Sequence, residues 1–251
     1  MYAATLSVVA DWLRALALPV TTIQPRSADA HETPLSVRMV RQSLRARRVI
    51  AVGGGLEGYL EALGRALGRR VPISLLMDHL QPPPDDLHIW LDLRYVRQSC
   101  AQALIWARED GFAGVAQRQA WARTQLQILQ LERRVREARS ALQGMAYLAV
   151  HDAYRPLTRQ LGMRSLGSLQ PDHERPPSLH QLRVAIERGR RAGVAMVLTS
   201  EPSGIGATVA RTLGVPLVLA DTLETPETTH DYFARFAGLV DALVQAGSGR
   251  P

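Results

Sequence analysis

The segment Arg48–Leu76, RVIAVGGGLEGYLEALGRALGRRVPISLL, contains one complete strand–helix–strand pattern. It starts with an apolar run that ends at Gly53, continues as an amphipathic helical pattern over Leu56–Leu67, and returns to an apolar run over Pro72–Leu76. Parallel neighbouring strands need a crossover connection of this kind, which is usually a helix. The segment therefore predicts two parallel strands and an α/β fold.

The alternation of strand-like and helical runs extends in both directions from this segment. Toward the N-terminus, Thr5–Val9 is expected to form a strand and Asp11–Leu18 a helix, and the alternation restarts at Tyr147 in the second half. Between the halves, Gln117–Gln143 contains no Pro or Gly and carries apolar residues at helical spacing. This pattern predicts one long helix of roughly 25 residues, about 38 Å at 1.5 Å per residue.

These observations predict an α/β fold of two lobes, each with a mostly parallel sheet flanked by helices, joined by one long helix. The expected parts are an N-terminal α/β lobe (1–114), the connecting helix (115–143) and a C-terminal α/β lobe (144–251).

The composition is that of a globular protein, with 251 residues, 46% hydrophobic and 21% charged. The formal net charge of +7 invites a nucleic-acid interpretation, but all 30 basic residues are Arg, they are scattered, and only three Phe are present as stacking platforms. No apolar run reaches the length of a membrane span. We therefore expect neither a nucleic-acid partner nor a membrane-spanning segment.

The N-terminus and the cysteine content bear on the compartment. Met1–Ala10 lacks a basic region and is followed at once by Asp11 and Arg14, so it resembles a strand entering a helix more than a signal peptide. Either the protein is cytoplasmic or a leader has been removed. The single Cys100 excludes an internal disulfide, and its helical context predicts a buried structural thiol.

Three histidines and one aspartate, His31, His88, His151 and Asp221, are the strongest candidates for chemistry. His151 and Asp221 directly follow predicted strands, and His31 lies in a loop shortly after one. Ligands of open parallel sheets bind outside the carboxyl ends of the strands. Three imidazoles and a carboxylate are a sufficient ligand set for a first-row divalent metal, zinc above all. Taken singly, each residue could equally be a solvated, capping or core side chain.

Carboxylates near these histidines could orient the imidazole rings. Asp29, Glu32, Asp92 and Asp152 are close in sequence, but the sequence does not assign them to particular rings. Glu201 follows another predicted strand and is a reserve ligand.

The turn Gly53–Gly58 supports an alternative, because GGGLEG matches G-x-G-x-x-G between a strand and a helix. Gly53, Gly55 and Gly58 would then hold a dinucleotide in a nucleotide-dependent oxidoreductase. Against this, the Glu57 carboxylate would lie at the helix N-terminus, where the negatively charged pyrophosphate of a dinucleotide binds. A tight structural turn is the simpler interpretation.

A hydrolase has less support. Ser203 lies near glycines, but no G-x-S-x-G motif is present. A zinc hydrolase would need an open coordination position and a general base such as Glu201. The remaining histidines are expected at the surface: His79, His173, His180 and His230.

Six segments share their order and spacing with one family over nearly the whole chain. They are His31-Glu-Thr-Pro-Leu-Ser, Val52-Gly-Gly-Gly-Leu-Glu-Gly-Tyr-Leu, His88-Ile-Trp-Leu-Asp, Val150-His-Asp-Ala-Tyr, Ser200-Glu-Pro and Leu219-Ala-Asp221. In these segments the chain resembles the metal-binding solute-binding proteins of bacterial zinc and manganese ABC importers. His-Ile-Trp-Leu-Asp is the most specific of the six.

The resemblance implies a binding protein and not an enzyme. It implies two α/β lobes joined by one long rigid helix, with a metal ion held between them by His31, His88, His151 and Asp221. It also implies a structural role for the Gly53–Gly58 turn. Manganese-type members commonly carry Glu at the third ligand position, so His151 indicates Zn²⁺, with manganese or iron as the alternative. The resemblance further implies an extracytoplasmic, periplasmic-type monomer, without its leader, that delivers Zn²⁺ to the membrane permease of an ABC importer.

One feature of many zinc-type members is missing. They carry a His- and acid-rich loop between the first two ligands, whereas Gln81–Asp86 is short and rich in Pro. Any accessory role of that loop in metal capture is therefore expected to be absent here or supplied by another protein.

Overall fold

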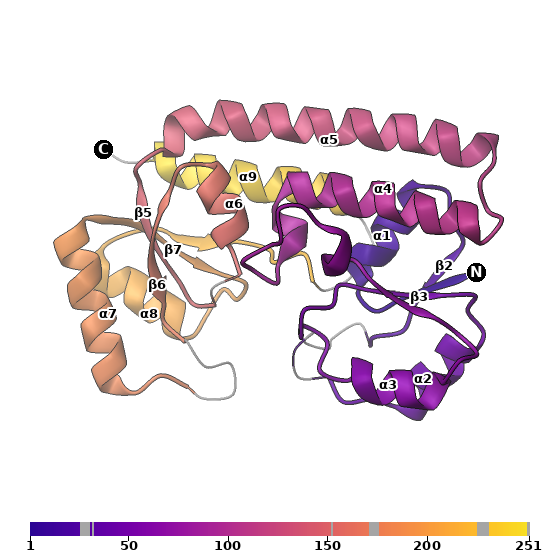
Figure 1. The fold of residues 1–251 in the computed structure, drawn as a ribbon. Helices are drawn as coiled ribbons and strands as arrows, with labels where there is room; N and C mark the ends of the chain where they lie inside the picture. The colour runs from indigo at the N-terminus through magenta and orange to yellow at the C-terminus, as the bar shows by residue number, and fades with distance from the viewer. Residues whose placement is uncertain (26–30, 32, 152, 171–175, 225–230, 250–251) are drawn as a thin grey trace. The chain divides into compact units, whose positions relative to one another are not determined.

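The computed structural model describes residues 1–251 except 26–30, 32, 152, 171–175, 225–230 and 250–251 (Figure 1). The described chain forms two compact units, each with its own four-stranded parallel sheet. The first unit comprises Met1–Gln130 and Leu223–Phe233, and the second comprises Leu131–Thr222 and Ala234–Pro251. The α/β class with parallel sheets flanked by helices, expected from the sequence, is confirmed.

The sheet of the first unit has the strand order β2-β1-β3-β4. Its strands are β1 (Tyr2–Ala4), β2 (Val20–Thr22), β3 (Val49–Ala51) and β4 (Ile73–Leu75). The strand–helix–strand pattern of Arg48–Leu76 forms β3, α3 (Leu60–Leu67) and β4, and Ile50 pairs in parallel with Ser74. Helix α3 begins later than expected because a turn precedes it, in which Gly53, Gly54 and Gly55 adopt φ of 86°, 65° and 91°. Only glycine adopts such angles without strain.

Helices cover both faces of this sheet (Figure 1). Helices α2 (Val37–Leu44) and α3 lie on one face, and the Ser36 side chain caps α2 by accepting from the Met39 N–H. The buried residues between these helices and the strands are Ala3, Ile23, Met39, Ala46, Val49, Tyr59, Leu63, Leu67 and Val71. On the other face, α1 (Ser7–Ala15) packs near α4 (Leu93–Glu109).

The strand expected at Thr5–Val9 is wrong. Strand β1 ends at Ala4 and helix α1 begins at Ser7. The residues from Leu6 to Ala10 are buried without interruption, so their pattern is compatible with either a buried strand or a buried helix. The hydrogen bonds mark where the strand gives way to the helix: the Thr5 N–H still donates to the Ile50 carbonyl of β3 at 3.0 Å, whereas the Ala10 N–H donates to the Leu6 carbonyl at 3.1 Å, one helical turn back.

The sheet of the second unit has the order β6-β5-β7-β8. Its strands are β5 (Ala146–Ala149), β6 (Arg164–Ser168), β7 (Val194–Thr199) and β8 (Leu217–Leu219), and its helices include α6 (Arg155–Gln160), α7 (Leu179–Ala192) and α8 (Ile205–Leu213). Apolar residues of α7 and α8, such as Ala185 and Val209, pack with Leu148 and Val197 of the strands in one buried cluster. Ser178 and Gln181 form a capping box at the start of α7.

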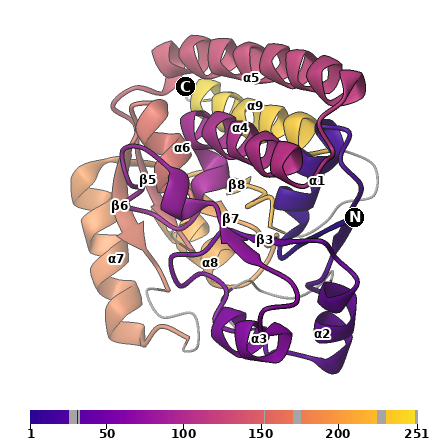
Figure 2. The same ribbon diagram turned by 45° about the vertical axis from the view of Figure 1, so that its right-hand side comes forward.

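Two helices belong in part to each unit. Helix α5 (Val115–Leu142) is unbroken in both views of the ribbon, as the sequence predicts (Figures 1 and 2). Its residues up to Gln130 belong to the first unit and those from Leu131 to the second. Helix α9 (Tyr232–Ser248) likewise starts in the first unit. That α5 joins two lobes rigidly stays a prediction.

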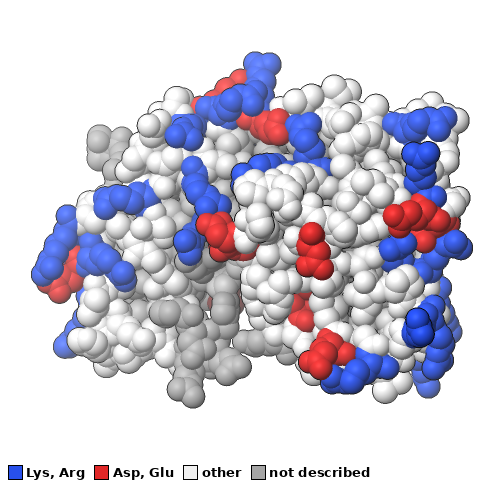
Figure 3. Space-filling model, viewed as in Figure 1, with Lys and Arg blue, Asp and Glu red and all other residues white. Residues whose placement is uncertain are grey.

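In the view of Figure 3, the charged side chains do not form one large patch of a single sign. Arginine side chains are spread over this face, and carboxylates lie beside several of them. Among the described residues, several arginines form ion pairs with acids one helical turn away, such as Arg133 with Glu137 and Arg191 with Glu187. None of the helices in the described part of the chain combines the length and apolar character that a membrane crossing requires.

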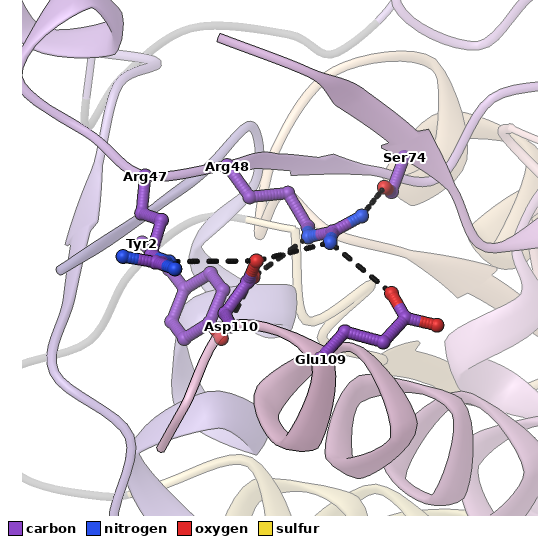
Figure 4. Close-up of polar contacts among 6 residues, drawn as sticks. All are labelled: Tyr2, Arg47, Arg48, Ser74, Glu109 and Asp110. Atoms are coloured by element: carbon purple, nitrogen blue, oxygen red, sulfur yellow. Dashed lines mark hydrogen bonds and ion pairs between the residues drawn. The ribbon is translucent and has the colours of Figure 1, made fainter.

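A cluster of polar contacts fixes the end of α4 to the first sheet (Figure 4). The Arg48 guanidinium donates to both carboxylate oxygens of Asp110, at 2.8 and 3.1 Å, and to the Ser74 hydroxyl at 2.8 Å. The Tyr2 hydroxyl also donates to Asp110, at 3.1 Å. Burial raises the pKa of Asp110, but the hydrogen bonds and charge of Arg48 outweigh it, so the pKa lies below its ordinary value.

We expect Asp110→Asn to lower the free energy of unfolding at pH 7 by about 3 kcal/mol, because it leaves a largely buried guanidinium without its bidentate partner. A carboxyl group with a lowered pKa in the folded state stabilises above its unfolded pKa, and this stability is lost as pH falls through the folded pKa. The difference between the two proteins should therefore shrink below about pH 4. Urea denaturation at pH 7 and pH 3 measures both effects.

The matched control is Asp241→Asn, because Asp241 pairs with Arg134 through side chains that are 55% and 46% exposed. It should change the unfolding free energy by less than about 1 kcal/mol. Equal losses in the two variants would contradict the role given to Asp110.

Candidate metal centre

His88 is a buried histidine whose ring is held by a neighbouring carboxylate. It lies directly before the short 3-10 helix Ile89–Leu91 that leads into α4, and its side chain is 8% exposed. One oxygen of Asp86 accepts from the His88 backbone N–H at 2.9 Å and lies 2.8 Å from ring Nδ1. A carboxylate at Nδ1 favours the tautomer protonated there, so Nε2 presents its lone pair.

Two further potential ligands lie near this Nε2 within the first unit. Oε1 of Glu224 is 3.6 Å from it, and the centre of the His31 ring is 5.9 Å from that of His88. The Glu224 side chain is 11% exposed. Two imidazoles and a carboxylate therefore gather at one place in the first unit, and the sequence-predicted pair His31 and His88 is among them.

Glu224 and Asp86 are functional candidates that the sequence reasoning did not select. Glu224 is fixed to the first unit because its backbone oxygen accepts from the Ser7 hydroxyl at 2.6 Å, at the start of α1. Its only sequence signal is its place three residues after Asp221. Asp86 lies two residues before His88, which was a usable signal for a ring-orienting partner.

Of the carboxylates that the sequence offered as partners of the histidine rings, one has another role and three lie outside the described residues. Asp92 caps α4 by accepting from the Arg94 N–H at 2.9 Å. Asp29, Glu32 and Asp152 lie outside the described residues.

The other two predicted ligands belong to the second unit. His151 is partly buried and follows β5, and Asp221 follows β8. Strand β7 lies between β5 and β8 in the sheet, so both residues occupy its carboxyl edge. Glu201 follows β7 at the same edge and is exposed.

Asp221 is engaged by an arginine. Its two carboxylate oxygens accept from Nε and Nη2 of Arg235, each at 2.8 Å. Arg235 lies on α9 and its side chain is only 4% exposed, whereas that of Asp221 is 41% exposed. Such bidentate pairs are strong and geometrically specific. A ligand role for Asp221 stays a prediction.

Two of the histidines that were expected at the surface are exposed, His79 and His180. The other two, His173 and His230, lie outside the described residues. Cys100 is buried, as expected, and burial raises its pKa to about 12.

The glycine turn holds a carboxylate of the chain itself. Glu57 is buried and accepts from the Thr5 hydroxyl at 2.6 Å and from the N–H groups of Val52 and Gly53 at 2.9 and 3.0 Å. Burial raises the pKa of Glu57, and these donors partly offset the rise. Backbone N–H groups that bind phosphate in a dinucleotide site are therefore occupied here, which supports a structural turn.

Several solved structures share the fold of this chain. The solute-binding protein FpvC of Pseudomonas aeruginosa, in complex with Mn²⁺, has a TM-score of 0.84 and 17% identity, covering 98% of this chain and 97% of its own. A ZnuA crystal structure has a TM-score of 0.84 and 16% identity, covering 98% of both chains. The Zn(II)-bound ZnuA-like domain of Streptococcus pneumoniae AdcA has a TM-score of 0.79 and 17% identity, covering 98% of this chain and 97% of its own.

Two parallel-sheet units, with histidines at or near the carboxyl edges of their sheets, are the fold that this chain shares with these solved structures. The chain belongs to the family of the periplasmic zinc-uptake complex component A, ZnuA, whose sequence model matches residues 3–246. A comparison with curated protein sequences finds no match.

We expect Glu57→Gln to destabilise the fold by about 1–3 kcal/mol, because the new amide group would face the Gly53 N–H and leave a buried donor unsatisfied. Urea denaturation followed by tryptophan fluorescence measures the change. The control is Glu61→Gln on the exposed face of α3, which should alter stability by less than about 0.5 kcal/mol. Unchanged stability of Glu57→Gln would show that the turn does not depend on this carboxylate.

Proposed function

We propose that this chain captures Zn²⁺ with His31, His88, His151 and Asp221 and delivers it to the membrane permease of an ABC importer. The observation that carries the proposal is the orientation of His88, whose Nδ1 is held by Asp86 while Nε2 lies 3.6 Å from Oε1 of Glu224 and the ring lies beside that of His31. Ligand histidines in metal sites are oriented by such acceptors.

The choice of zinc rests on the donor types. Neutral imidazole suits zinc, whereas sets rich in carboxylate, carbonyl and water suit manganese. The family is described by zinc uptake, and His151 stands where manganese-type relatives commonly have Glu. Manganese or iron is the alternative cargo, since FpvC of similar fold was solved with Mn²⁺.

A transport role agrees with closed coordination. Four protein ligands leave no open position for a reacting water, which suits a cargo ion and not hydrolysis. We further propose that the protein acts as a monomer outside the cytoplasm, where the family is periplasmic. Release of the ion would then need movement of ligand-bearing loops or displacement at the permease.

The first test is a competitive zinc titration of the metal-stripped full chain against a chromophoric chelator. The wild type should bind one equivalent with nanomolar or tighter affinity. His88→Ala should weaken zinc binding by more than about 100-fold. Loss of a ligand should exceed the effect, about 10–100-fold, of replacing a residue that only orients a ligand.

The control variant is His180→Ala, because His180 is an exposed residue of α7. Its affinity should equal that of the wild type. Absence of zinc binding by the wild type, or equal binding by His88→Ala, would contradict the proposed function. Parallel titration with Mn²⁺ separates the two candidate cargoes.

A second prediction concerns the orienting carboxylate. Asp86→Asn should lower zinc affinity by about 10–100-fold, because the asparagine oxygen is a weaker acceptor for the Nδ1 proton. The chelator competition measures it, and Asp85→Asn in the same loop is the control. An Asp86→Asn protein with wild-type affinity would remove Asp86 from the centre.

A further inference from the structure

We infer that the turn Gly53–Gly58 sets the distance between His31 and His88. The turn acts as a spacer, and Gly54 and Gly58 are its positioning residues, because they carry no side chain where the two histidine-bearing segments pass. The inference rests on the proposed function, since it concerns two of the proposed zinc ligands. It also accounts for the recurrence of glycines in this turn.

The turn lies between the two chain segments that carry these histidines. His31 follows β2 at one end of the strand order β2-β1-β3-β4, whereas the segment that leads to His88 follows β4 at the other end. The turn directly follows β3 and leaves the same carboxyl edge of the sheet between them. The two segments therefore approach each other beside this turn where they bring their imidazole rings to a centroid distance of 5.9 Å.

Two glycines of the turn lie close to these segments. A Cβ on Gly58 would lie 3.5 Å from the backbone oxygen of His31. A Cβ on Gly54 would lie 2.5 Å from Sδ of Met77 and 3.2 Å from Cδ2 of Leu87, the residue directly before the second histidine. Side chains at these two positions would therefore need the space that the histidine-bearing segments occupy.

The turn itself is fixed to the sheet. Glu57 is only 2% exposed and accepts from the N–H groups of Val52 and Gly53 and from the Thr5 hydroxyl. A Cβ on Gly53 would lie 3.0 Å from that of Leu75 at the end of β4. Because the turn is held by these contacts, a side chain added on its outer face should displace the neighbouring segment and not the turn.

The test compares three variants of the full metal-stripped chain by zinc titration against the chromophoric chelator. Gly58 is not among the glycines with positive φ, so a side chain there meets the His31 segment without backbone strain. Gly58→Ala should stay close to wild-type affinity, because 3.5 Å is an ordinary contact distance. Gly58→Val adds two methyl groups beside this contact and should weaken zinc binding by at least about 10-fold.

The control for lost stability is Gly68→Ala at the end of α3. Gly68 has φ of 56°, and a Cβ there would meet none of the described atoms within 4 Å. This variant should lower the melting temperature of the metal-free protein through backbone strain and keep wild-type zinc affinity. Bound Co²⁺ should show an altered visible spectrum in Gly58→Val and an unaltered one in Gly68→Ala.

A double-mutant cycle separates positioning from a general structural role. In a His31→Ala background, Gly58→Val should lower zinc affinity by less than about 2-fold, because its effect acts through a ligand that is already absent. Wild-type affinity in Gly58→Val, equal losses in the two backgrounds, or the same loss in Gly68→Ala would overturn the inference and leave the proposed function standing. A wild-type chain that does not bind zinc would instead overturn the proposed function.

Discussion

Backbone N–H groups in the loops at the carboxyl edge of the first sheet are satisfied by side-chain carboxylates. The strands of this sheet have only three residues each. The hydrogen bonds between strands therefore end early, and the backbone N–H groups of the following loops need other acceptors. Glu57 accepts after β3, and Asp86 and Asp92 accept on either side of the 3-10 helix before α4. These bonds set the backbone from which His88 projects.

Asp86 is a structural acceptor that, in the proposed function, also orients a ligand. A single oxygen of this residue accepts from the His88 backbone and faces its ring Nδ1. The same contact therefore fixes the loop, the ring orientation and the favoured tautomer. Glu57 is the contrasting case, since its carboxylate accepts from the Thr5 hydroxyl and from the N–H groups of Val52 and Gly53 within the fold. A glycine-rich pattern alone does not distinguish a structural turn from a dinucleotide-binding turn, but the burial of Glu57 does.

Much of the fold follows from local sequence signals. The long helix α5 follows from a segment that contains no Pro or Gly and carries apolar residues at helical spacing. The parallel pairing of β3 with β4 follows from one strand–helix–strand pattern. The strand predicted at Thr5–Val9 is wrong because a fully buried apolar run has no periodicity that distinguishes a strand from a helix.

The candidate site was less accessible to sequence reasoning. His31 and His88 could be selected by residue type and position, and the structure brings their rings together. The environment of the carboxylates could not be predicted, because the bonds of Ser7 to Glu224 and of Asp221 to Arg235 join residues distant in sequence. Spacing identifies an acid at a strand end but does not tell whether an arginine already neutralises it.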